Sequence, residues 1–67
     1  MLEQAVAQLD RAASKALASA ELAHFGMRYD DALLHADEVV QLVERQDPRY
    51  ERAAKIADEA RAKTRTR

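Results

Sequence analysis

The sequence predicts an all-α protein in which an antiparallel helical hairpin is followed by a third helix, in an up-down-up arrangement. Hydrophobic residues make up 48% and charged residues 34% of the 67 residues, and strong helix formers such as alanine and leucine dominate. The single glycine and the single proline divide the chain into three segments of helical periodicity. We therefore expect one helical domain over residues 1–63 and a basic C-terminal tail over residues 64–67.

The first helix is expected from about Leu2 to Phe25. Apolar residues recur on one face at alternating spacings of four and three, as in a coiled-coil seam: Leu2, Val6, Leu9, Ala13, Ala16, Ala20 and Ala23. The opposite side holds a second apolar stripe, formed by Ala18, Leu22 and Phe25, together with the polar residues Gln4, Gln8, Arg11, Ser14 and Lys15. Because a helix that is apolar on two sides needs two neighbours, we expect a second chain to cover this stripe.

Gly26 is expected to end the first helix in the left-handed conformation, and Asp30 to cap the second helix. That helix should extend from about Asp31 to Gln46. Its expected buried stripe consists of Tyr29, Ala32, Leu33, Ala36, Val39, Val40 and Val43. Leu34 and Leu42 lie outside this stripe, so they too are candidates for contact with another chain.

Asp47 can cap the third helix, and Pro48 suits its first position because the missing N–H would have no partner there. This helix is expected from about Arg49 to Lys63. Its expected buried face is mostly alanine: Tyr50, Ala53, Ala54, Ala57 and Ala60, with Ile56 at the edge. Such a face contributes little transfer free energy but allows close helix approach. The short connections favour antiparallel neighbours.

Size and composition indicate that the chain needs a partner. A domain this small buries only about 60% of its unfolded surface, and without cysteine it has no disulfide or thiolate metal site. We therefore predict a homodimer or higher oligomer. The N-terminal "MLEQAVAQLD" lacks the features of a secretory signal, and no run approaches the roughly 18 apolar residues of a membrane span. We expect a cytoplasmic protein without membrane contact.

From Gly26 onward, the sequence resembles a tetratricopeptide-type helical hairpin. The matching residues are Gly26, Tyr29, Ala32 and the Asp47-Pro48 pair, with "YDDAL" closest to the pattern. The chain departs from the family where Ala18-Ser19 replaces a Leu-Gly pair, and it has no tryptophan. "YDDALLHADEVVQLVERQ" followed by "RYERAAKIADEA" is also similar to the three-helix microtubule-interacting-and-trafficking domain. Both resemblances imply a protein-interaction module without catalysis.

One constellation suits metal chemistry. Glu-x-x-His in the first helix and His-x-x-Glu in the second resemble the ligand pairs of di-iron bundles, and the corner between the helices would bring them together. The candidate ligands are Glu21, His24, Asp31, His35 and Glu38. However, such a site normally uses four helices with inward-pointing ligands, and charged pairs at this spacing are ordinary on exposed helices. We therefore predict neither a metal nor another cofactor.

The charge distribution leaves nucleic acid as an alternative partner. Residues 1–47 hold nine acids against four Lys and Arg, whereas residues 48–67 hold seven Lys and Arg against three acids. A basic strip on the third helix and the tail is compatible with nucleic-acid contact, although Glu59 interrupts it and no aromatic platform accompanies it. Pairing of the acidic first two helices of one copy with the basic third helix of another is the competing interpretation.

The favoured interpretation is a small helical protein-interaction module, working as an adaptor, an assembly factor or an inhibitor. The sequence offers no cysteine nucleophile and no glycine-rich phosphate loop, so we do not expect an enzyme. The expected partners are a second copy of the chain and another protein. The candidate interface residues are Ala18, Leu22, Phe25, Leu34 and Leu42.

Overall fold

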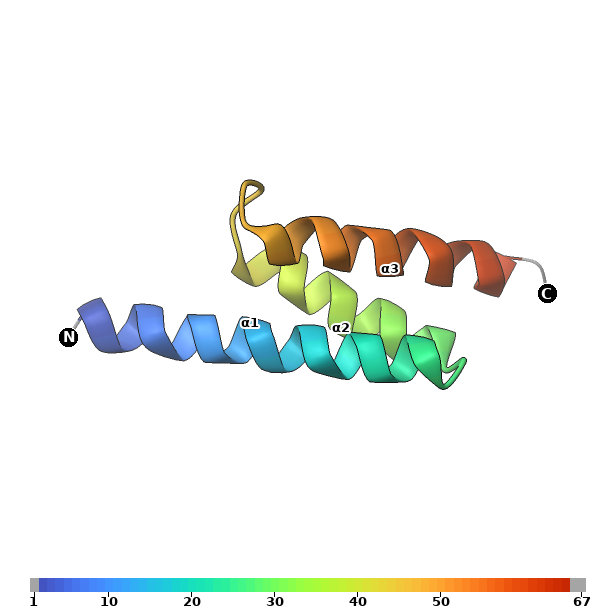
Figure 1. Ribbon diagram of the computed structural model, residues 1–67, viewed down its shortest axis with the longest axis horizontal. Helices are drawn as coiled ribbons and strands as arrows, with labels where there is room; N and C mark the ends of the chain where they lie inside the picture. The colour runs from blue at the N-terminus through green and yellow to red at the C-terminus, as the bar shows by residue number, and fades with distance from the viewer. Residues whose placement is uncertain (1, 66–67) are drawn as a thin grey trace.

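The computed structural model describes residues 2–65, and the side chains of residues 7–65. It contains three helices: α1 (Leu2–Phe25), α2 (Tyr29–Leu42) and α3 (Pro48–Arg65). They run up, down and up, with α2 packed against both neighbours and less contact between α1 and α3 (Figure 1). This confirms the all-α class and the antiparallel hairpin followed by a third helix. Within the described range, no helix is both long and apolar enough to cross a bilayer.

Alanine forms most of the core. Of the eleven buried apolar residues in the described part of the chain, nine are alanine and the others are Leu17 and Val39. One cluster joins all three helices near their middle, and a second lies toward the α1–α2 corner, around Ala23, Ala32 and Ala60. Small side chains let the helix axes approach closely, which explains how three helices fit within a molecule only 14 Å thick along its shortest axis.

The expected seam of α1 is buried only in part. Its members from Ala13 to Ala23 are buried as predicted, whereas Leu9 is 50% exposed. The prediction for Leu9 is wrong because the N-terminal turns of α1, drawn in blue, extend past the ends of α2 and α3 (Figure 1). The side chains of Leu2 and Val6 lie outside the described residues. Leu17, which the seam did not include, is buried.

The first corner is a Schellman motif displaced by one residue from the expected position. The Arg28 N–H donates to the Ala23 carbonyl at 2.8 Å, and the Met27 N–H donates to the His24 carbonyl at 3.1 Å. Gly26 still bonds as a helical residue, because its N–H donates to the Leu22 carbonyl at 3.0 Å. Met27, with φ 61°, is the residue with positive φ, so the prediction of a left-handed Gly26 is wrong.

The bounds of α2 also differ from expectation. The helix begins at Tyr29, and its N-cap is Arg28 without a side-chain cap bond, so Asp30 is not the cap. Asp30 and Asp31 instead lie in the first turn, where carboxylates interact favourably with the positive end of the helix dipole. The helix ends at Leu42 rather than Gln46, because Val43 is extended, with φ −118° and ψ 159°.

The second corner begins α3 as predicted. The Asp47 carboxylate accepts the Arg49 backbone N–H at 2.9 Å, with Pro48 between them as the first helical residue. At the other end, α3 includes Thr64 and Arg65, so the first half of the expected tail is helical. Residues 66 and 67 lie outside the described residues.

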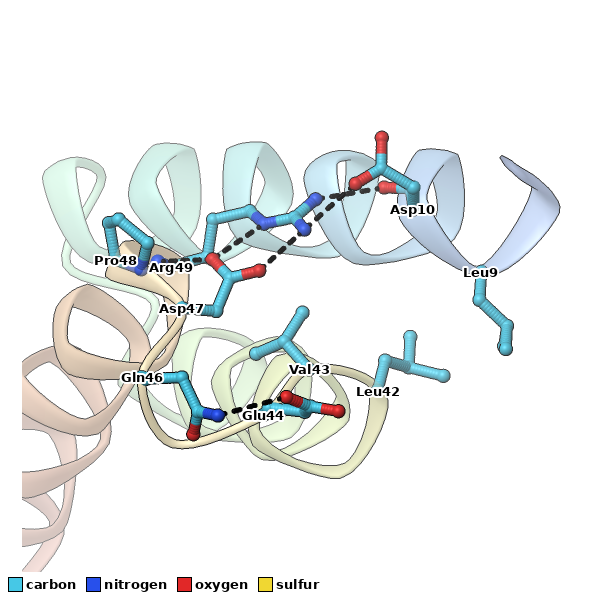
Figure 2. Close-up of a pocket in the computed structure, with 9 residues that line it drawn as sticks. All are labelled: Leu9, Asp10, Leu42, Val43, Glu44, Gln46, Asp47, Pro48 and Arg49. Carbon is cyan, nitrogen blue, oxygen red and sulfur yellow. Dashed lines mark hydrogen bonds and ion pairs between the residues drawn. The ribbon is translucent and has the colours of Figure 1, made fainter. Parts of the chain in front are cut away.

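The Arg49 side chain joins this corner to α1 (Figure 2). Its guanidinium donates to both carboxylate oxygens of Asp47, at 3.0 and 2.7 Å. It also contacts the Asp10 carboxylate at 2.8 Å, and donates to the Asp10 carbonyl and the Ser14 hydroxyl at 3.1 and 2.9 Å. The hydrogen bonds from Arg49 lower the pKa of Asp47 from 3.8 to about 2, and the pKa of Arg49 is raised above its usual range, chiefly by the bond to Asp47.

The conformation of the first corner predicts how substitutions of Met27 and Gly26 change the free energy of unfolding. Met27→Gly should stabilise the fold by about 1 kcal/mol, because glycine adopts positive φ without the clash of a Cβ atom. Met27 is 74% exposed, so little packing is lost. Gly26→Ala should be neutral or stabilising, because its Cβ would meet its nearest neighbours at an ordinary 3.5 Å. Urea unfolding measures both changes. Met27→Ala is the matched control, since it shortens the side chain but keeps the Cβ; a gain equal to that of Met27→Gly would contradict the backbone explanation.

The Arg49 anchor makes a prediction about pH. The pKa of Asp47 in the folded state is about 2, below its ordinary value of 3.8. The ionised carboxylate therefore stabilises the folded state at pH values above 3.8. That contribution should decline as the pH falls from about 5 toward 2. Asp47→Asn keeps a capping side chain but removes the charge. The melting temperature of the parent should exceed that of the variant at pH 6, and the gap should narrow as the pH falls. A gap of constant size would show that the charge contributes nothing.

Candidate interaction surface

The outer face of α1, defined here as Arg11, Lys15, Ala18, Leu22 and Phe25, combines apolar and basic side chains. By the 3.6-residue period these residues lie opposite the buried alanines of the same helix, and all of them are exposed. Leu22 is 67% and Phe25 is 89% exposed. Met27, in the corner directly after α1, adds a third exposed apolar side chain at this end of the molecule.

The outer face of α2, defined here as Asp30, Leu34, Glu38 and Gln41, has the opposite charge. All four residues are exposed, and Leu34 is 58% exposed in the middle of the face. The whole helix contains four acids and neither lysine nor arginine. Glu38 has one weak partner on the same helix, His35, whose Nδ1 lies 3.4 Å from its Oε1. The helix therefore presents an acidic surface with one large apolar side chain in the middle of it.

Leu42 lies elsewhere, in a hollow at the α2–α3 corner. This open hollow of about 370 Å³ has Leu9, Leu42, Val43 and Pro48 as its apolar lining residues, and the Arg49 ion pairs lie beside it (Figure 2). Leu42 is half-buried here. The five candidate interface residues therefore occupy three places: the outer face of α1, the outer face of α2, and this hollow.

The cations of α3 are less available than the sequence indicated. Arg49 forms ion pairs with Asp47 and Asp10. The Arg61 guanidinium lies 3.4 Å from the Asp37 Oδ1 and 3.7 Å from the Asp58 Oδ1. Arg52 and Lys55 are exposed, and they share a hollow between α1 and α3 with Glu21, His24, Phe25, Ile56 and Glu59. The two carboxylates in that hollow, Glu21 of α1 and Glu59 of α3, offset these two cations, so the basic strip is interrupted at this part of α3.

The candidate metal ligands do not converge. His24 lies on the α3 side of α1, where its Nε2 is 2.6 Å from Glu59 Oε2, and Glu21 lines the same hollow. Asp31 and His35 instead line a hollow on the α1–α2 side, with Ser19 and Leu22. The expectation that the corner brings the two motifs together is therefore wrong. In the part of the chain that the structure describes, no three His, Asp or Glu side chains are placed to hold a metal ion.

Two features of this surface were not foreseen from the sequence. The sequence counts Arg49 among the seven cations of residues 48–67, whereas its position two residues after a helix cap lets its guanidinium bond back to the cap. His24 was considered with its neighbours along the chain, whereas its partner Glu59 is 35 residues away. No local pattern signals that contact, because it depends on how α3 lies against α1.

Comparison with protein-family models, with curated proteins and with solved structures gives no match for this chain.

The separation of the two histidines makes a prediction about metal binding. His24→Gln combined with His35→Gln should leave helix content unchanged and alter the free energy of unfolding by no more than about 0.5 kcal/mol, because both side chains are near the surface. Circular dichroism and urea unfolding, with and without added zinc, measure this. A large stabilisation of the parent by zinc that the double variant loses would instead establish a metal site.

Proposed function

We propose that this chain is a small protein-interaction module that self-associates through the outer face of α1. The observation that carries the proposal is the exposure of Leu22 and Phe25, at 67% and 89%, on the side of α1 opposite its buried alanines. Large apolar side chains that gather on the surface of a small domain are typical of a binding site. Met27, exposed in the adjoining corner, extends the same apolar end.

The composition of the core supports a requirement for a partner. Among the side chains that are less than 2% exposed, Val39 is the largest, and most of the others are alanine. Burial stabilises by about 0.8 kcal/mol for each CH₂ group removed from water, so alanine contributes little. Covering Leu22 and Phe25 in an interface would add apolar burial that the single chain does not have.

The resemblances to the tetratricopeptide and the microtubule-interacting-and-trafficking modules point to the same class of function. We infer from them a role as an adaptor, an assembly factor or an inhibitor that covers part of another protein, with the cytoplasm as the proposed location. We favour protein over nucleic acid as the partner, because Arg49 and Arg61 are engaged within the chain. Binding is favoured over catalysis, because the hollows described above are open, whereas catalytic pockets enclose most of a small substrate.

The proposal is tested by the mass of the protein in solution. We expect the parent to be larger than the 7.5 kDa monomer in light scattering at high micromolar concentration. Leu22→Glu and Phe25→Glu should each reduce it to the monomer mass, because an interface that buries an unpaired carboxylate is destabilised. Each variant should also melt at a lower temperature than the parent at the same concentration, because association stabilises the folded state.

The matched control is Ala62→Glu, which adds the same charge at an exposed apolar position on α3. By the helical period, Ala62 points away from the buried face of that helix, so this variant should retain the mass of the parent. A parent protein that is monodisperse at 7.5 kDa would overturn the proposed self-association. Monomer formation by Ala62→Glu as well would show that the effect is not specific to α1.

A further inference from the structure

The two outer faces differ in charge. On the outer face of α1 the charged residues are Arg11 and Lys15, both cationic. On the outer face of α2 they are Asp30 and Glu38, which lie four residues before and four residues after Leu34. Each face also exposes a large apolar side chain, Leu22 or Leu34. The two surfaces are therefore complementary in charge, and both have apolar area to bury.

The two faces are also similar in length, and they point in opposite directions. The outer face of α1 extends over 15 residues from Arg11 to Phe25, or about 22 Å, and the outer face of α2 extends over 12 residues from Asp30 to Gln41, or about 18 Å. Because α1 and α2 pack against each other through their buried faces, their outer faces lie on opposite sides of the hairpin. One copy therefore cannot bring its own two faces together, but two copies can.

We propose that the outer face of α2 in one copy docks on the outer face of α1 in a second copy. This inference builds on the proposed self-association and specifies both of its surfaces. Leu34 of one copy packs over Ala18 of the other, because the small side chain leaves room beside Leu22. One of the two carboxylates that flank Leu34 then reaches Lys15 and Arg11.

The contact joins two different surfaces, so it is heterologous. A heterologous contact leaves one unused face at each end of a pair, and further copies add until a ring closes or the stack ends. This differs from a two-fold dimer, in which the outer face of α1 would pack on the same face of its partner. Charge pairing between the copies also makes the assembly sensitive to salt, because the Debye length falls from about 10 Å at 0.1 M to about 3 Å at 1 M.

The test uses two variants that each block one face. Leu22→Glu places a carboxylate on the basic face of α1, and Leu34→Lys places a cation on the acidic face of α2. Both positions are exposed, so the fold should be retained. Each new charge has the same sign as the incoming face of another copy and therefore repels it. Glu38→Lys is a second variant of the α2 face that leaves Leu34 in place. Circular dichroism confirms that each variant folds, and light scattering measures the mass of each variant alone and of equimolar mixtures.

We expect every variant alone at 7.5 kDa, and the mixture of Leu22→Glu with Leu34→Lys at twice that mass, because each chain contributes the face that the other lacks. The mixture of Leu22→Glu with Phe25→Glu is the matched control and should stay monomeric, because both chains have a blocked α1 face. The heterodimer should weaken as NaCl is raised from about 0.1 M to about 1 M.

Three outcomes would overturn the inference. If the parent self-associates and both Leu34→Lys and Glu38→Lys still do so, the α2 face is not involved, and the proposed function stands on the α1 face alone. If the variants are all monomers but the complementary mixture stays monomeric, association needs both faces intact in the same copy, and a contact between the α1 face of one copy and the α2 face of another does not form on its own. If the parent itself is a monomer, both the inference and the proposed self-association fail.

Discussion

The close approach of three helices over alanine side chains is the constraint on which the rest of this structure depends. Nine of the eleven buried apolar residues among those described are alanine, and such a narrow core leaves the larger side chains little room inside. Leu22, Phe25 and Leu34 remain exposed because each lies on the side of its helix opposite the alanine stripe. The same packing that brings the helices together therefore also places the large apolar residues where another chain can reach them.

Ion pairs link α1 with α3, the two helices between which the alanine core provides the least contact. Arg49 connects the cap of α3 with the backbone and carboxylate of Asp10 on α1, and His24 connects α1 with Glu59 near the other end of α3. Both contacts cross between the two helices that pack least against each other. Each contact ends on an exposed carboxylate, Glu59 or Asp10, where an ion pair contributes little to stability, so the alanine packing remains the main constraint on how α1 lies against α3.

The number and order of the helices could be predicted from the sequence, because Gly26 and Pro48 interrupt a strong helical period. The bounds were less predictable: α2 ends at Leu42 because Val43 turns to an extended conformation, and no residue near it is a helix breaker. The sequence predicts a left-handed Gly26, because glycine adopts that conformation without strain, yet the left-handed residue of the corner is Met27. At the candidate surface, periodicity identified Leu22, Phe25 and Leu34, but Leu9 and the partners of Arg49 depend on where the neighbouring helices end.

The order of packing has a consequence for the rate at which the chain folds. Helices that are adjacent in sequence are also the main neighbours in space, and helical proteins dominated by such local contacts fold within microseconds to milliseconds. Only the α1–α3 contacts, such as those that join residues 35 or 39 positions apart, require a longer loop to close. The α1–α2 and α2–α3 hairpins can therefore form first, and the contacts between α1 and α3 follow once both hairpins are in place.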